Sequence, residues 1–248
     1  RALYAAGHLP GAMYADLNAD LSAPPTAASG RHPLPSPATF EAWLRTRGVN
    51  RGSVVVAYDD GNAAYASRLW WMLRWVGHDE AFVLDGGLRR WTALGLPTDT
   101  RVPAPGPGDF VARLRPTMVV DAAQVLASIG DEATRMLDAR GPERYRGEVE
   151  PIDPVAGHVP GARNHPFTTN LGDDGRFLPA AQLKAAFSEQ LGQVAPRDAI
   201  TMCGSGVTAC QLLLAMEHAG LPGARLYAGS WSEWCRDPAR PVARGAAP

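Results

Sequence analysis

The stretch AITMCGSGVTA, residues 199–209, decides the fold of this chain. Its first four residues are apolar or β-branched and predict a short buried strand that ends on Cys203, while a helical pattern starts near Val207. The intervening Gly204-Ser205-Gly206 allows a sharp turn that aims backbone N–H groups inward, and the start of the helix adds its positive end. We therefore predict a reactive thiolate in a loop that can also hold an anion.

Two other interpretations of Cys203 compete with this one. A buried structural cysteine would need neither the glycines nor the change from strand to helix. A phosphatase-like loop would need an arginine six residues after the cysteine to hold phosphate bidentately, and that position is Ala209. Cys210 and Cys235 have no metal-ligand spacing, so we expect them to be inert, and we expect neither a metal nor a cofactor.

The composition excludes several classes of partner. The chain has 248 residues, of which 46% are hydrophobic, and 24 Lys and Arg against 25 Asp and Glu give a formal net charge of -1. That balance predicts no nucleic-acid partner and no membrane surface, and no apolar run reaches the roughly 20 residues that span a bilayer. Three cysteines cannot pair completely, which favours a reducing compartment and predicts a cytoplasmic protein. We expect a monomer.

Two halves of the chain repeat one pattern. The repeated pieces are the turns HLPGA (8–12) and HVPGA (158–162), the strands before Asp59 and Cys203, and the segments AFVLDGG (81–87) and ARLYAGS (224–230). Strands alternate with helical segments in each half, so we predict an α/β fold with mostly parallel sheets and helices on both faces. The two copies have a histidine at the same position, His8 in the first and His158 in the second, which favours a structural role in the turn.

The repeat also predicts the domain boundaries. We expect a first domain over residues 1–100, a Pro/Gly-rich linker over 101–116 and a second domain over 117–248. A strand-like segment, 136–140, precedes the second HxPGA turn, whereas only residues 1–7 precede the first, so the first domain is expected to lack its opening strand. Asp59 stands at the position of Cys203, so the first domain is expected to be inert.

The hexapeptide CGSGVT, the paired HxPGA turns and the inert first copy resemble the two-domain rhodanese family of sulfurtransferases, most of all its 3-mercaptopyruvate branch. The thiosulfate branch typically has Arg-Lys in place of Gly204-Ser205. The resemblance implies two tandem rhodanese-like domains. It also implies a cycle in which Cys203 takes a sulfur from 3-mercaptopyruvate, or alternatively from thiosulfate, as a persulfide. A thiol, thioredoxin or cyanide then accepts that sulfur.

The resemblance further implies roles for other residues. Cys203, Ser205 and His32 correspond to a catalytic set, in which His32 and Ser205 belong to a relay like that of serine proteases. The residues expected to bind the donor are Arg144, Arg31, Gly204, Gly206, Val207 and Thr208. Asp138 and Arg140 are expected to pair and brace the loop.

Two positions depart from the family pattern. The acid of the relay aligns with Asn18, which can orient a histidine but cannot stabilise its charged form. Asp153 stands in a segment where the mercaptopyruvate branch often has a second arginine. Both departures leave thiosulfate open as the donor, and they leave open a non-catalytic sulfur carrier or docking module, since fold alone does not decide function.

Overall fold

The computed structural model describes residues 1–248, which form two compact units. Unit 1 comprises residues 1–24, 34–115 and 173–176, and unit 2 comprises residues 25–33, 116–172 and 177–248. None of the helices combines the length and the apolar character that a membrane crossing requires.

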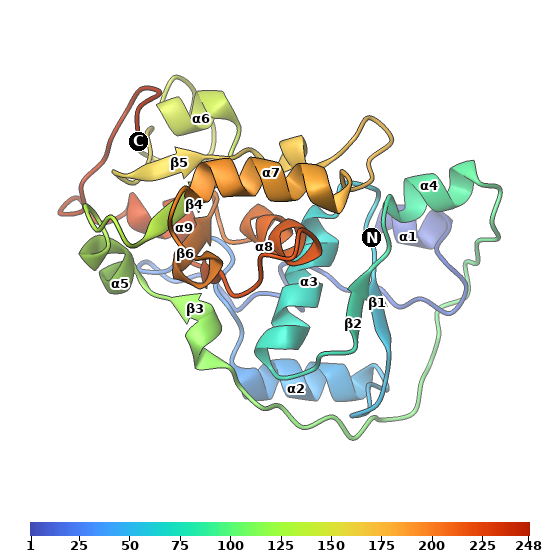
Figure 1. Cartoon of the computed structure of the whole chain (residues 1–248). Helices are drawn as coiled ribbons and strands as arrows, with labels where there is room; N and C mark the ends of the chain where they lie inside the picture. Colours follow the sequence, from blue (N-terminus) through green and yellow to red (C-terminus); the bar gives the residue numbers. More distant parts are fainter. The chain divides into compact units, whose positions relative to one another are not determined.

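Unit 2 is built on a five-stranded parallel sheet (Figure 1). Its strands are β3 (Val119–Val120), β4 (Arg135–Asp138), β5 (Ala162–Asn164), β6 (Ala199–Met202) and β7 (Arg225–Tyr227), and their order in the sheet is β3-β7-β6-β4-β5. All four pairings are parallel. Strand β6 therefore has a neighbour on each side, and its carboxyl end lies at the kind of sheet edge where α/β proteins bind ligands.

Helices cover both faces of this sheet, as the alternating pattern predicted. They are α5 (Ala122–Ala127), α6 (Pro142–Arg146), α7 (Ala180–Leu191), α8 (Thr208–His218) and α9 (Ser230–Trp234), with 3-10 turns at Pro116–Met118, Phe167–Asn170 and Pro196–Asp198. Ile200 and Met202 of β6 pack in one cluster with Val125 of α5 and with Trp231 and Trp234 of α9. Helix α8 packs against α7, β6 and β7. This confirms the α/β class.

Unit 1 carries a smaller version of the same pattern. Its elements are α1 (Ala2–Ala6), α2 (Pro37–Thr46), β1 (Val55–Ala57), α3 (Ala64–Trp75), β2 (Ala81–Val83) and α4 (Gly87–Ala93). Strands β1 and β2 are parallel, with Val56 opposite Phe82. Within residues 1–248, the element before His8 is helix α1 and not a strand. A cavity of about 720 Å³ lies along β1 in the same unit.

Residues 25–33 pack with unit 2, although the sequence-based division put them in the first domain. The Arg31 N–H donates to Ser232 Oγ, and the Arg236 guanidinium donates to the carbonyls of Thr26 and Ala27. Residues 101–115 contain no helix or strand and belong to unit 1, where the N–H of Arg113 donates to the carbonyl of Val76.

The two repeated histidines hold their turns. His8 is fully buried, stacks on Tyr4 at 3.9 Å, and has one ring nitrogen 2.8 Å from the Tyr4 carbonyl. His158 is fully buried and repeats the arrangement with Tyr145, at 3.9 Å and 2.9 Å. Because both units share this arrangement, it supports a structural role for both histidines.

The loop after β1 is an anion cradle that the chain fills by itself. Asp59 Oδ1 accepts hydrogen bonds from the N–H groups of Gly61 and Ala63, at 2.9 and 3.0 Å. Asp59 Oδ2 accepts from Tyr65 and Ala66 at 3.0 and 3.1 Å, at the start of α3. Four backbone amides thus surround one carboxylate, as expected for a turn that leads into a helix N-terminus.

We expect Asp59→Ala to destabilise unit 1 by about 2–4 kcal/mol, because it leaves four amides without their charged acceptor. Asp59→Asn keeps one acceptor oxygen and should cost less. Hydrogen exchange of the α3 amides checks this, with α8 of unit 2 as the internal reference. Unchanged α3 protection in Asp59→Ala would show that the cradle adds nothing to stability.

Candidate functional site

Cys203 lies directly beyond the carboxyl end of β6, and helix α8 starts five residues later at Thr208. Its side chain is buried, and the N–H of Gly206 donates to Sγ at 3.1 Å. Gly206 has φ +75°, and a Cβ there would collide with the Ala228 carbonyl oxygen, so glycine is required. The other expected loop amides, those of Gly204, Val207 and Thr208, make no hydrogen bond to Sγ; the amide at Gly206 is the donor.

The loop is held from behind by the start of α9. The N–H groups of Trp231 and Ser232 donate to the carbonyls of Cys203 and Gly204, at 3.0 and 2.9 Å. In unit 1, Leu88 and Arg89 donate in the same way to Asp59 and Asp60, at 2.9 and 3.2 Å. The repeat therefore extends to the backbone hydrogen bonds that fix the position of each loop.

Ser230 differs from its counterpart in the repeat, Gly87. Both have a left-handed backbone, with φ 53° at Ser230 and φ 55° at Gly87, a conformation that is strained for serine and not for glycine. The Ser230 hydroxyl accepts the N–H of Cys203 at 3.1 Å and donates to the Tyr227 carbonyl at 2.9 Å. Sequence reasoning missed this residue, although the change from Gly-Gly to Gly-Ser between the copies was the signal.

His32 and Ser205 meet as expected. His32 Nδ1 and Ser205 Oγ lie 2.7 Å apart in a hydrogen bond across 173 positions of the chain. Asp16, one of the acids near Asn18 in sequence, accepts the N–H groups of Asn18 and Ala19 within its own turn in unit 1. Of the three groups expected in the relay, the structure joins the histidine and the serine.

Arg31 and Arg144 converge on Gly204. A Cβ built on Gly204 would lie 2.8 Å from Arg31 Nη2 and 3.4 Å from Arg144 Nη1. Arg146, the other arginine of that segment, pairs instead with Glu148 at 2.7 Å on the surface of the unit. Arg144 is thus the arginine that reaches the cysteine loop, and two guanidinium groups lie beside Gly204 where an anionic donor could bind.

Two buried acids hold these arginines. Arg144 donates to Glu150 at 2.6 Å and to Asp153 at 3.2 Å, and Arg31 forms an ion pair with Asp153. Burial alone would raise the pKa of Glu150, but hydrogen bonds from Arg144 and from two backbone amides outweigh burial and lower that pKa. The expected pair also forms, with Arg140 donating to Asp138 at 2.7 Å. Arg140 lies 4.8 Å from the centre of the Trp231 ring, directly behind the loop.

The other two cysteines lie apart from this chemistry. Cys210 is fully buried in α8, and its S–H donates to the Gly206 carbonyl at 3.3 Å. Burial raises the pKa of the Cys235 thiol. None of the three cysteines forms a disulfide, and residues 1–248 contain no group of three His, Cys, Asp or Glu side chains arranged to hold a metal ion.

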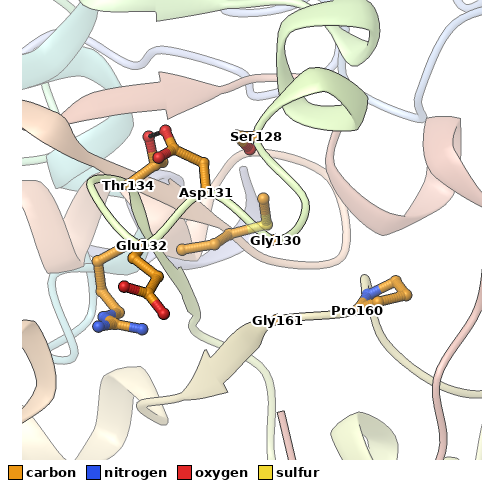
Figure 2. Close-up of a pocket in the computed structure, with 9 residues that line it drawn as sticks. Ser128, Gly130, Asp131, Glu132, Thr134, Pro160 and Gly161 are labelled. Atoms are coloured by element: carbon orange, nitrogen blue, oxygen red, sulfur yellow. Dashed lines mark hydrogen bonds between the residues drawn. The ribbon is translucent and has the colours of Figure 1, made fainter.

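A small pocket of unit 2 lies at the other end of the sheet (Figure 2). It has a volume of about 170 Å³ and is lined by residues such as Asp131, Glu132 and Pro160, around the start of β4 and the turn before β5. Because strands β4, β5 and β6 are parallel, Cys203 lies beyond the opposite ends of these strands. The pocket therefore takes no part in the site around Cys203.

We expect Ser230→Ala and Ser230→Gly to slow the alkylation of Cys203 by iodoacetamide about 5- to 30-fold, because each removes the acceptor of the Cys203 amide, worth about 1–2 kcal/mol. Ser230→Gly also relieves the backbone strain and should be the more stable variant. Mass spectrometry of the modified thiol and hydrogen exchange of β6 check the two effects. If Cys203 is alkylated in Ser230→Gly at the same rate as in the unmodified protein, Ser230 contributes only to packing.

Comparison with known proteins agrees with this geometry. The family described as Rhodanese-like domain matches residues 1–94 and 121–237. A probable 3-mercaptopyruvate sulfurtransferase of Pseudomonas aeruginosa is 51% identical over 245 residues, which are 98% of this chain and 86% of the relative. A putative thiosulfate sulfurtransferase of Mycobacterium tuberculosis is 42% identical over 253 residues, covering 99% of this chain and 86% of the relative.

Solved structures agree as well. The crystal structure of SseA from Escherichia coli, described as a 3-mercaptopyruvate sulfotransferase with the rhodanese fold, matches with a TM-score of 0.80 and 36% identity. The match covers 93% of this chain and 86% of that one. The chain belongs to the rhodanese family, with one rhodanese-like domain in each half.

Proposed function

We propose that this protein is a sulfurtransferase that moves a sulfur from 3-mercaptopyruvate to a thiol, thioredoxin or cyanide acceptor through a persulfide on Cys203. One observation carries the proposal: Arg31 and Arg144 meet at Gly204, the residue next to Cys203. Two guanidinium groups beside a cysteine would suit a small donor that carries one carboxylate and one sulfur, which supports the proposal. Relatives at 51% and 37% identity carry the corresponding name.

In the proposed first step, the Cys203 thiolate attacks the sulfur of 3-mercaptopyruvate. An S–S bond forms, the C–S bond breaks, and its electron pair leaves on carbon as the enolate of pyruvate. The enolate then takes a proton, for which Ser205 with its hydrogen bond to His32 is the proposed donor. The N–H of Gly206, which contacts Sγ, stabilises negative charge on the sulfur in both states.

In the second step the acceptor attacks the outer sulfur of the persulfide. The S–S bond breaks, the acceptor keeps the transferred sulfur, and Cys203 returns as a thiolate. No external oxidant or reductant enters with cyanide as acceptor, because the two electrons that the donor sulfur gives up in the first step leave with the carbon of pyruvate, and the sulfane sulfur then passes to cyanide as thiocyanate. Gly204, Val207 and Thr208 supply the backbone that surrounds the transferred sulfur.

Thiosulfate is the second candidate donor, with the same cysteine and with sulfite as the leaving group. It remains a candidate because Asp153 stands where a further arginine would strengthen the binding of a carboxylate. A relative at 42% identity is named a putative thiosulfate sulfurtransferase. We further propose a monomer located in the cytoplasm; the lack of a disulfide among the three cysteines fits a reducing compartment.

Steady-state turnover with each donor separately, with cyanide as acceptor, tests the proposal. We expect turnover with 3-mercaptopyruvate above that with thiosulfate, and a loss of at least 1000-fold with either donor in Cys203→Ser, which removes the nucleophile. Cys235→Ser is the matched control and should retain activity. Absence of turnover with both donors, with a persulfide still formed on Cys203, would instead identify a sulfur carrier.

Thiol selectivity provides a second prediction. Below pH 8, iodoacetamide should modify Cys203 at least tenfold faster than Cys235, whose thiol has its pKa raised by burial, and faster than Cys210 inside α8. Peptide mapping after short exposures measures the three rates. Equal rates at all three cysteines would contradict an activated loop.

A further inference from the structure

The carboxylate of Asp153 lies between the two guanidinium groups that reach the cysteine loop. Its Oδ1 forms the ion pair with Arg31, and its Oδ2 accepts from Arg144 at 3.2 Å. The Asp153 side chain is only 4% exposed, so water screens these contacts weakly. Two like charges are thereby held side by side, with a negative charge between them.

The nitrogens that Asp153 leaves open are those nearest Gly204. Arg31 uses Nη1 for Asp153, and its Nη2 lies against Gly204. Arg144 uses Nε and Nη2 for the two acids, and its Nη1 lies against Gly204. An anion at Gly204 would therefore contact one side of each guanidinium, with the Asp153 charge on the other side.

The charges in this cluster cancel. Three guanidinium groups are connected by ion pairs to three carboxylates; the members are Arg31, Arg140, Arg144, Asp138, Glu150 and Asp153. Each of the three acids is at most 4% exposed. A bound donor can thus form hydrogen bonds with the guanidinium groups, although the cluster has no net positive charge. Asp153 repels every negative charge on the donor.

We propose that Asp153 selects the charge of the sulfur donor, favouring a monoanionic carboxylate over a dianion. The proposal rests on the proposed sulfurtransferase function and concerns the same site. The Coulomb repulsion from Asp153 is proportional to the donor's charge, so it weighs twice as much on thiosulfate as on 3-mercaptopyruvate. Asp153 is thereby a specificity-determining residue, and the arginines supply the directional hydrogen bonds.

Asp153 is better suited to this role than the neighbouring Glu150. Glu150 also accepts the backbone N–H groups of Ile152 and Asp153, both at 3.1 Å, so it shapes the segment itself. The contacts of the Asp153 carboxylate are with the two arginines. Its charge can therefore be removed with little effect on the backbone.

The test compares the unmodified protein with Asp153→Asn, which removes the charge and keeps the shape. The first readout is kcat/KM with thiosulfate divided by kcat/KM with 3-mercaptopyruvate, and we expect this ratio to rise at least threefold. Glu148→Gln is the matched control, because it removes an acidic charge five residues away that pairs only with Arg146, and its ratio should not change. An unchanged or lower ratio in Asp153→Asn overturns the proposal.

The second readout needs no turnover. Iodoacetate carries one negative charge and iodoacetamide none, so the ratio of their alkylation rates at Cys203 reports the charge of the site. This ratio should rise at least threefold in Asp153→Asn and in Asp153→Ser, and stay constant in Glu148→Gln. No rise in either Asp153 variant overturns the proposal, whereas failure of the unmodified protein to turn over either donor counts against the sulfurtransferase function alone.

Discussion

The structure of the site depends on one constraint, which is that backbone hydrogen bonds hold the turn after a parallel strand so that amides of the turn face the side chain at its start. In unit 2 that turn follows β6, and the amides of Trp231 and Ser232 hold its carbonyls in place. In unit 1 the equivalent amides hold the turn after β1. Because these braces are backbone groups, they persist while the side chain inside the turn changes.

That side chain decides what each unit can do. Asp59 brings its own carboxylate into the cradle and satisfies four amides. Cys203 fills the corresponding position with a sulfur that accepts one amide. The remaining capacity for negative charge is what a nucleophile and its anionic product need. Unit 1 thus shows the same turn with a carboxylate in place of the thiol.

The fold could be predicted from the sequence because the repeat carries it. Strand ends at Asp59 and Cys203, glycines in the turns and the HxPGA motifs are local signals, and each corresponds to an element of the structure. Contacts between residues far apart in the sequence could not be predicted in this way. The ion pair of Arg31 with Asp153 joins residues 122 positions apart, and the packing of residues 25–33 with unit 2 depends on such contacts. Ser230 belongs to the repeated segment, but its strained backbone appears only in three dimensions.

The same division between backbone and side chain explains where specificity resides. Amides cradle any small anion, so the turn around Cys203 can activate the sulfur without distinguishing one donor from another. In the mechanism that we propose, discrimination comes from charges at its rim, where Arg31 and Arg144 supply geometry and Asp153 supplies the opposing charge. Since buried charges interact strongly, the exchange of one rim residue can alter the preferred donor while the turn, the sheet and the nucleophile stay the same. Relatives that share this fold and carry the names of different donors fit such a division of roles.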